Sequence, residues 1–383
     1  MKRVIKLPFI SKLEHNLAHS PQFLQVLLGS RQVGKTTSIL HFLEHEYSTP
    51  YLYVSADAIL SANLSWVIEN WQNARAKGAT IVIDEIQKVH NWAETIKALW
   101  DDEKRRPNPI ACILLGSSSL DIQKGLTESL TGRFQLTRAH HWNFSESKAA
   151  YEISFDEFLH FGGYPASYAF VKSPQDWSNY VQTSIVSTVI EKDILSNHTV
   201  KSPALFKQAF EILIAYPAQE ISYTKILGQL QDKGNTDLIK HYIALFEGAY
   251  LLRALEKFSQ KPLVKKSSSP KILPLCSAFY YLTLQSSYEP EERGRAFELL
   301  VGCQLDRTGL ELYYWREGNF EVDFVLKRGK EIWGIEVKSG KKRSPRGLEK
   351  FKGSFPQAKT VIISPDNYFE VVVNPILYME KVS

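Results

Sequence analysis

Residues 29–36 read GSRQVGKT, in which two glycines, a lysine and a threonine have the spacing of a phosphate-binding loop. Gly29 and Gly34 would let successive backbone N–H groups turn toward phosphate oxygens. Lys35 is then expected to reach the β and γ phosphates, and the Thr36 hydroxyl to coordinate Mg²⁺. The predicted cofactors are therefore ATP and Mg²⁺. The residues predicted to bind the nucleotide are Gly29, Ser30, Arg31, Gln32, Val33, Gly34, Lys35, Thr36 and Thr37.

Two carboxylates follow about fifty residues later. The apolar run Thr80 to Ile83 ends in Asp84 and Glu85, so a strand would deliver both acids to the carboxyl edge of a sheet, where ligands bind. Asp84 is predicted to be a Mg²⁺ partner and Glu85 the base that polarises the attacking water.

Two more polar positions have competing interpretations. Ser117, at the end of the run LLGSSS, fits a polar sensor of the γ-phosphate, or a turn without a role. Arg133 fits a catalytic arginine that stabilises charge in the same or a neighbouring subunit, or an ordinary surface ion pair.

A second constellation lies near the C-terminus. Asp323 falls in the strand-like run EVDFVL, and Glu336 and Lys338 fall in GIEVKSG, two residues apart and so on one face of a strand. Two carboxylates and a lysine at neighbouring strands can hold Mg²⁺ and activate water against a phosphodiester. Glu298, on a preceding helical run, is a predicted fourth metal ligand. The alternative is a solvated hairpin without chemistry.

The elements that must position these residues can be read from periodicity. Near-continuous apolar runs at 23–29, 50–57, 80–87 and 109–119 alternate with helical patterns, which predicts an α/β domain with a parallel sheet covered on both faces. A short strand at 133–138 would extend the sheet. This P-loop domain is predicted to span residues 1–172.

The rest of the chain changes character twice. Helical patterns over 205–258, followed by a Lys/Ser/Pro-rich segment at 257–271 that is either the wing or a loop, resemble a winged helix within a helical domain at 173–286. This winged helix is either a DNA reader or a structural connector. A helix, three strands, a helix and a strand then predict a compact α+β domain at 287–383.

Composition limits the class of protein. The 383 residues are 44% hydrophobic and 23% charged, with a net charge of +5, so a disordered or fibrous chain is excluded. The first residues do not have the pattern of a signal peptide, and no run reaches the roughly 18 apolar residues of a membrane span. A cytoplasmic protein without membrane contact is predicted. The three cysteines are not spaced for a disulfide framework or a zinc site.

The charge is concentrated in the C-terminal third. Between Asp323 and Gly353 there are ten Lys and Arg residues against four Asp and Glu. Such a basic stretch predicts contact with the phosphate backbone of DNA.

Several motifs in this order resemble bacterial and archaeal ATPases of the extended AAA superfamily that carry a C-terminal domain of unknown function. The resemblance covers most of the chain and rests on GSRQVGKT, IVIDEIQKV, LLGSSS, SLTGRF, FGGYP, GRAFE, YYWRE, EVDFVL and GIEVKSG. It implies ATP binding through Gly34, Lys35 and Thr36, and hydrolysis through Asp84 and Glu85.

The same resemblance implies a winged-helix segment and a terminal domain with the fold of restriction-endonuclease-like, PD-(D/E)XK nucleases. Asp323, Glu336 and Lys338 then match the nuclease triad, and Glu298 matches the helix acid.

Two hypotheses about function remain open. In the first, an ATPase is coupled to a Mg²⁺-dependent nuclease-like domain that binds and cuts DNA. In the second, ATP switches a protein that binds DNA or another protein, and the nuclease-like domain is inactive. A homo-oligomer is expected if Arg133 acts in a neighbouring subunit.

Overall fold

The computed structural model describes residues 4–19, 21–58, 62–116, 119–230, 235–259, 268–284, 288–339 and 346–383. Its contacts divide the chain into two compact units, Met1–His140 and His141–Ser383. Residues 141–172, which the sequence assigned to the first domain, therefore group with the second unit. Within the described residues, no helix is both long enough and apolar enough to cross a membrane.

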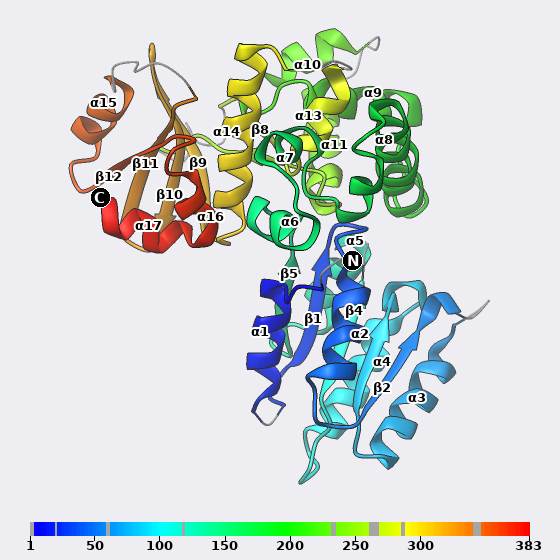
Figure 1. Ribbon diagram of the computed structural model, residues 1–383. Helices are drawn as coiled ribbons and strands as arrows, with labels where there is room; N and C mark the ends of the chain where they lie inside the picture. The colour runs from blue at the N-terminus through cyan, green and yellow to red at the C-terminus, as the bar shows by residue number, and fades with distance from the viewer. Residues whose placement is uncertain are drawn as a thin grey trace. The chain divides into compact units, whose positions relative to one another are not determined.

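The first unit contains a five-stranded parallel sheet, as predicted, in the order β2-β3-β4-β1-β5. The central strands β1, β3 and β4 are buried along their whole length, so helices must cover both faces. Figure 1 shows these helices flanking the sheet. The strands are β1 Leu24–Gly29, β2 Tyr51–Ser55, β3 Thr80–Asp84, β4 Cys112–Gly116 and β5 Phe134–Ala139, and the helices are α1 Pro8–Leu17, α2 Lys35–His45, η1 Ala56–Ala58, α3 Leu64–Ala76, η2 Ile86–Lys88, α4 Trp92–Glu103 and α5 Ser119–Ser129.

Glycine is required where the edge strand β5 meets β1. The two strands pair in parallel from Leu24 opposite Phe134 to Gly29 opposite Ala139. A Cβ atom on Gly29 would lie 2.0 Å from the carbonyl oxygen of Ala139. The first glycine of the loop therefore also permits the close approach of β5.

The second unit begins with helices, which are α6 Phe144–Tyr151, α7 Phe155–Phe161, η3 Pro165–Phe170, α8 Pro174–Tyr180, η4 Val181–Ser187 and η5 Val189–Leu195. Capping boxes start two of them, from Asn143 and from Ser154. The first part of the predicted helical domain at 173–286 is helical, but η4 and η5 are π-helices rather than α-helices. A π-helix has hydrogen bonds between residues five apart. The N–H of Ser196 donates such a bond to the carbonyl of Glu191 at 3.1 Å.

In the region for which the sequence predicted a winged helix, the described residues form the helices α9, α10 and α11 and a small antiparallel sheet of order β6-β8-β7. Part of its predicted wing, residues 260–267, lies outside the described residues. The elements are α9 Pro203–Ile214, β6 Gln219–Glu220, α10 Tyr223–Gln229, α11 Thr236–Gly248, β7 Leu252–Leu255 and β8 Lys271–Pro274.

The C-terminal part is α+β. Its sheet has the order β12-β11-β10-β9, in which β12 is parallel to β11 and the other pairs are antiparallel. Figure 1 shows α14 running beside this sheet, and α14 also packs on β8. The elements are α13 Ser277–Leu284, α14 Pro290–Asp306, β9 Glu311–Glu317, β10 Phe320–Arg328, β11 Glu331–Val337, α15 Arg346–Ser354, β12 Lys359–Ile363, α16 Tyr368–Val373 and α17 Pro375–Val382.

Candidate functional site

The phosphate loop joins the end of β1 to the start of α2. Gln32 and Gly34 have φ values of 59° and 84°, and α2 begins at the next residue, Lys35. Left-handed residues inside a tight loop turn neighbouring N–H groups toward one side, and the helix adds its positive N-terminal end. The loop backbone is therefore shaped to receive an anion.

The Lys35 ammonium is held against this loop. Only 8% of the residue is exposed. Its Nζ donates hydrogen bonds to the carbonyls of Gly29, at 2.9 Å, and Ser30, at 2.6 Å. A fixed positive charge therefore lies beside the anion-binding backbone.

Asp84 joins the loop to the end of β3. The Thr36 hydroxyl donates to Asp84 Oδ2 at 2.9 Å, and the Tyr53 hydroxyl donates to the same oxygen at 2.7 Å. The backbone N–H of Glu85 donates to Asp84 Oδ1 at 2.9 Å. A hydroxyl oxygen and a carboxylate are ligands that Mg²⁺ prefers, so Thr36 and Asp84 fit this ion.

Tyr53 is a site residue that the sequence analysis missed. Burial raises the pKa of its hydroxyl, and the hydrogen bond to the Asp84 carboxylate raises it further. The phenol therefore remains a donor that fixes the carboxylate. No motif marks it, and its position follows only from the pairing of β2 with β3, in which Ser55 lies opposite Asp84.

Glu85 adopts a backbone conformation that is rare for residues other than glycine, with φ 54°. The Gln87 side-chain amide donates to its carboxylate. The other end of that amide, Gln87 Oε1, is buried and has no hydrogen-bond partner among the described residues. This geometry holds the Glu85 carboxylate directly beyond β3. Ser117, the predicted sensor, lies outside the described residues.

Arg133 lies beside the amino-terminal ends of the strands, whereas the phosphate loop lies at their carboxyl ends. Its carbonyl accepts a hydrogen bond from Leu24 at the beginning of β1, whereas Gly29 ends that strand. Six residues of strand, or roughly 20 Å, separate the two ends. The guanidinium instead pairs with both carboxylate oxygens of Asp101, at 2.7 and 2.9 Å. A role for Arg133 at the phosphate loop of the same chain does not fit this register.

In the second unit, the four predicted residues of the C-terminal constellation come together. Asp323 Oδ2, on β10, accepts a hydrogen bond from the N–H of Val337 on β11 at 2.7 Å. Lys338 pairs with Glu336. Burial raises the pKa of Glu336, and the charge of Asp323 raises it further. The two strands therefore present Asp323, Glu336 and Lys338 in one place.

The fourth predicted residue, Glu298 on α14, is joined to this place by Lys271, which the sequence analysis did not single out. The Lys271 Nζ donates to Glu298 Oε1 at 2.7 Å and to the carbonyl of Asp323 at 3.0 Å. It lies 3.7 Å from Glu321 Oε1. We call Lys271, Glu298, Glu321, Asp323, Glu336 and Lys338 the acidic cluster.

The charges of the acidic cluster depend on one another. Burial raises the pKa of Asp323 and of Glu298, and the Lys271 ammonium opposes both shifts. Burial lowers the pKa of Lys271, but Glu298, Asp323 and Glu321 raise it by more, so the net shift is upward. Lys271 is therefore a cation. Within the described ranges, no three His, Cys, Asp or Glu side chains are arranged to hold a metal ion.

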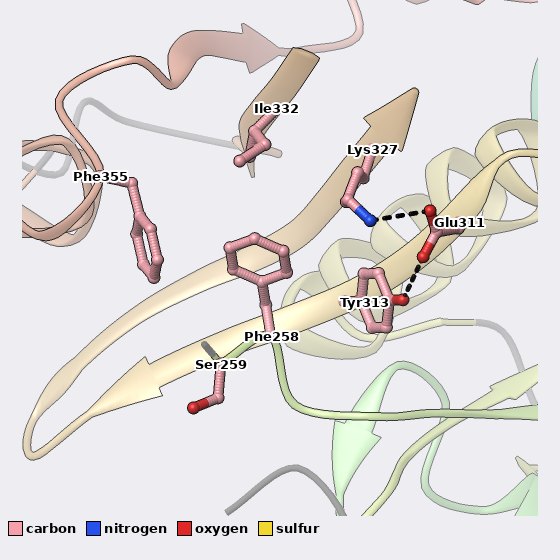
Figure 2. Close-up of a pocket in the computed structure, with 7 residues that line it drawn as sticks. All are labelled: Phe258, Ser259, Glu311, Tyr313, Lys327, Ile332 and Phe355. Atoms are coloured by element: carbon pink, nitrogen blue, oxygen red, sulfur yellow. Dashed lines mark hydrogen bonds and ion pairs between the residues drawn. The ribbon is translucent and has the colours of Figure 1, made fainter. Parts of the chain in front are cut away.

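A pocket of about 320 Å³ is lined by residues of β9, β10 and β11 in the C-terminal sheet (Figure 2). Its aromatic lining comes from Phe258, Tyr313 and Phe355. Lys327 and the Tyr313 hydroxyl both bind the Glu311 carboxylate, at 2.9 and 2.6 Å. The neighbouring Trp315 is only 3% exposed and packs in the core.

The parallel sheet and its strand–loop–helix site define the first unit as a P-loop nucleotide-binding fold. Residues 22–148 match the family model of an AAA domain, so the AAA-type P-loop prediction is confirmed for this part of the chain. Residues 152–275 and 293–376 match two domains of unknown function, DUF8612 and DUF4143. The nuclease-like resemblance of the C-terminal domain stays a prediction.

Curated relatives match over most of the chain. An uncharacterised protein of Methanocaldococcus jannaschii is 26% identical over 333 residues, which are 80% of this chain and 72% of the relative. Uncharacterised proteins of Mycobacterium bovis and Mycobacterium tuberculosis are each 23% identical over 338 residues, 86% of this chain and 72% of each relative. Among solved structures, a mutant of Thermotoga maritima RuvB matches at 14% identity with a TM-score of 0.35, covering 64% of this chain and 88% of that chain.

Proposed function

We propose that the protein binds ATP with Mg²⁺ and hydrolyses it in the cytoplasm. The observation that carries this proposal is the hydrogen bond between Thr36 and Asp84, because it joins the phosphate loop to the acidic end of β3 at 2.9 Å. In P-loop enzymes these two groups hold the ion that neutralises the phosphates.

The chain's own groups then have distinct tasks. The loop N–H groups and Lys35 bind and orient the phosphates, and Thr36 and Asp84 hold Mg²⁺, which supplies positive charge to the γ-phosphate. Glu85, held beyond β3, accepts a proton from the attacking water. If Arg133 is a catalytic arginine, it acts on the phosphate loop of a second copy of the chain.

The test is ATP turnover by Lys35→Ala, with Lys77→Ala as the control, since Lys77 is an exposed lysine at the C-terminal end of α3. We expect Lys35→Ala to lower turnover at least about 100-fold, because a positive charge on the transferred phosphate is lost. Lys77→Ala should keep wild-type turnover. Equal turnover in the two variants would reject the proposal.

For the second unit, we propose ATP-switched DNA binding without cleavage. A basic stretch attracts phosphate backbones, and the pocket lined by Lys327 offers the half-buried rings of Phe258 and Tyr313 as aromatic surfaces of the kind on which bases stack. The acidic cluster argues against cleavage, because Glu298, a predicted metal ligand, is already paired with Lys271, a lysine outside the predicted nuclease triad.

The test mixes the protein with single-stranded and supercoiled DNA in Mn²⁺, with and without ATP. We expect salt-sensitive binding that changes with ATP, that loses this ATP response in Lys35→Ala, and that leaves the DNA intact. Cleavage that disappears in Asp323→Ala would instead establish the nuclease. Failure to bind either DNA would remove DNA as the partner.

A further inference from the structure

Lys271 is the internal cation of the acidic cluster. It belongs to β8, where pairing with β7 and β6 sets it opposite Leu255 and Glu220. Its side chain is completely buried, which is rare for lysine unless the charge is paired. The strand pairing therefore fixes where the ammonium enters the cluster.

The ammonium has partners on every side that the structure describes. It donates to one Glu298 carboxylate oxygen and to the Asp323 carbonyl, and Glu321 lies within ion-pair distance. The ring of Phe324 lies 4.9 Å away, from its centroid to Nζ. Oxygen ligands and a nearby π-face are what a buried cation requires.

The position of the Lys271 ammonium excludes a second cation at the oxygens that it contacts, Glu298 Oε1 and the Asp323 carbonyl. Divalent ions bind carboxylate oxygens at roughly 2.0–2.6 Å. The Lys271 Nζ is 2.7 Å from the Glu298 oxygen that such an ion would use. An ion there would overlap the ammonium and be repelled by its charge. The residues present therefore do not fit a metal ion bound through Glu298 Oε1, and no three His, Cys, Asp or Glu side chains in the described part of the chain are arranged to hold one elsewhere.

We propose that the Lys271 ammonium takes the place of a divalent metal ion in the acidic cluster, so that a cation of the chain itself permanently occupies the site. This inference deepens the proposal of a second unit that does not cut DNA. It also predicts something separate from DNA: removing the lysine should let the carboxylates, which repel one another without a cation between them, close around a metal ion.

The experiment measures Mn²⁺ binding by titration calorimetry and by thermal unfolding, using the full chain without nucleotide. All proteins carry Thr36→Ala, which removes a metal ligand from the phosphate loop. Lys271→Met keeps the length of the side chain without its charge, and Lys271→Gln is a second variant that keeps a hydrogen-bond donor. Lys359→Met, on β12 of the same unit, controls for the loss of one positive charge.

We expect no Mn²⁺ binding at the cluster of the protein that retains Lys271. Lys271→Met or Lys271→Gln should bind one Mn²⁺, with Tm raised by about 5–10 °C at roughly 100 times the Kd. Adding Asp323→Asn should remove this binding, and Lys359→Met should not create it.

Two results would overturn the proposal. One is Mn²⁺ binding by the protein with Lys271 that Glu298→Gln or Asp323→Asn abolishes. The other is the absence of Mn²⁺ binding and of Mn²⁺-dependent folding in both Lys271 variants. Neither result depends on whether the protein binds DNA or hydrolyses ATP.

Discussion

At the scale of single residues, Asp84 is the point at which the nucleotide site is held together. Its Oδ2 accepts from Thr36 of the loop and from Tyr53 of the neighbouring strand, while its Oδ1 accepts from the N–H of Glu85. Groups that orient a metal ligand affect metal affinity without touching the metal. Tyr53 is such a positioning residue, because its hydroxyl donates a hydrogen bond to the carboxylate that would bind the metal.

We therefore expect Tyr53→Phe to weaken Mg²⁺ use and leave the fold intact. The Mg²⁺ concentration that gives half-maximal ATP turnover should rise about 10-fold, because Asp84 loses a donor that fixes its orientation. Tyr51→Phe, on the same strand two residues earlier, is the matched control and should not change the Mg²⁺ response. Identical Mg²⁺ titrations for the two variants would show that Tyr53 has no positioning role.

At the scale of elements, the acidic cluster depends on the close approach of α14 to β8 and β10. Glu298 and Gly302 are one helical turn apart and so lie on one face of α14. A Cβ on Gly302 would lie 2.5 Å from Leu273 Cδ1 and 2.7 Å from Phe324 Cζ. Glycine at this position brings Glu298 within reach of Lys271, because a larger residue would push the helix away.

Gly302→Ala should accordingly lower the free energy of unfolding of the second unit by about 1–3 kcal/mol, the usual cost of overpacking a filled core. Gly353→Ala is the control, because Gly353 lies in α15 and a Cβ there meets nothing within 4 Å. Alanine in that helix should raise stability by about 0.5–1 kcal/mol. Urea unfolding measures both, and equal midpoints would contradict the packing argument.

At the scale of the whole molecule, the acidic cluster helps to explain why residues 141–383 group as one compact unit. Lys271 comes from the region that matches one domain of unknown function, and Glu298 and Asp323 come from the region that matches the other. A buried ion pair between the regions ties their cores together, since removing either partner would leave an uncompensated charge. The nucleotide site lies wholly in the other unit, so any coupling between ATP and the second unit must act between the two units.

The sequence by itself determined the features that depend on spacing within a short segment. Four apolar runs and a fifth short one predicted the five parallel strands, because the alternation of strand and helix leaves few other folds. The loop from Gly29 to Thr36 and the acids after Ile83 each directly follow an apolar run. Both were therefore predicted to lie together at the carboxyl ends of the strands. The register of Asp323 with Glu336 and Lys338 likewise follows from a hairpin.

Only the tertiary structure decided which residues distant in sequence belong to these sites and which predicted residue lies away from them. Lys271 is 52 residues from Asp323, yet its ammonium donates to that residue's carbonyl. Tyr53 reaches Asp84 through strand pairing. The register of β5 with β1 places Arg133 at the amino-terminal ends of the strands, away from the phosphate loop. Such contacts arise from the packing of elements. The periodicity of a segment predicts whether it is a helix or a strand, but not which side chains of a neighbouring strand it will contact.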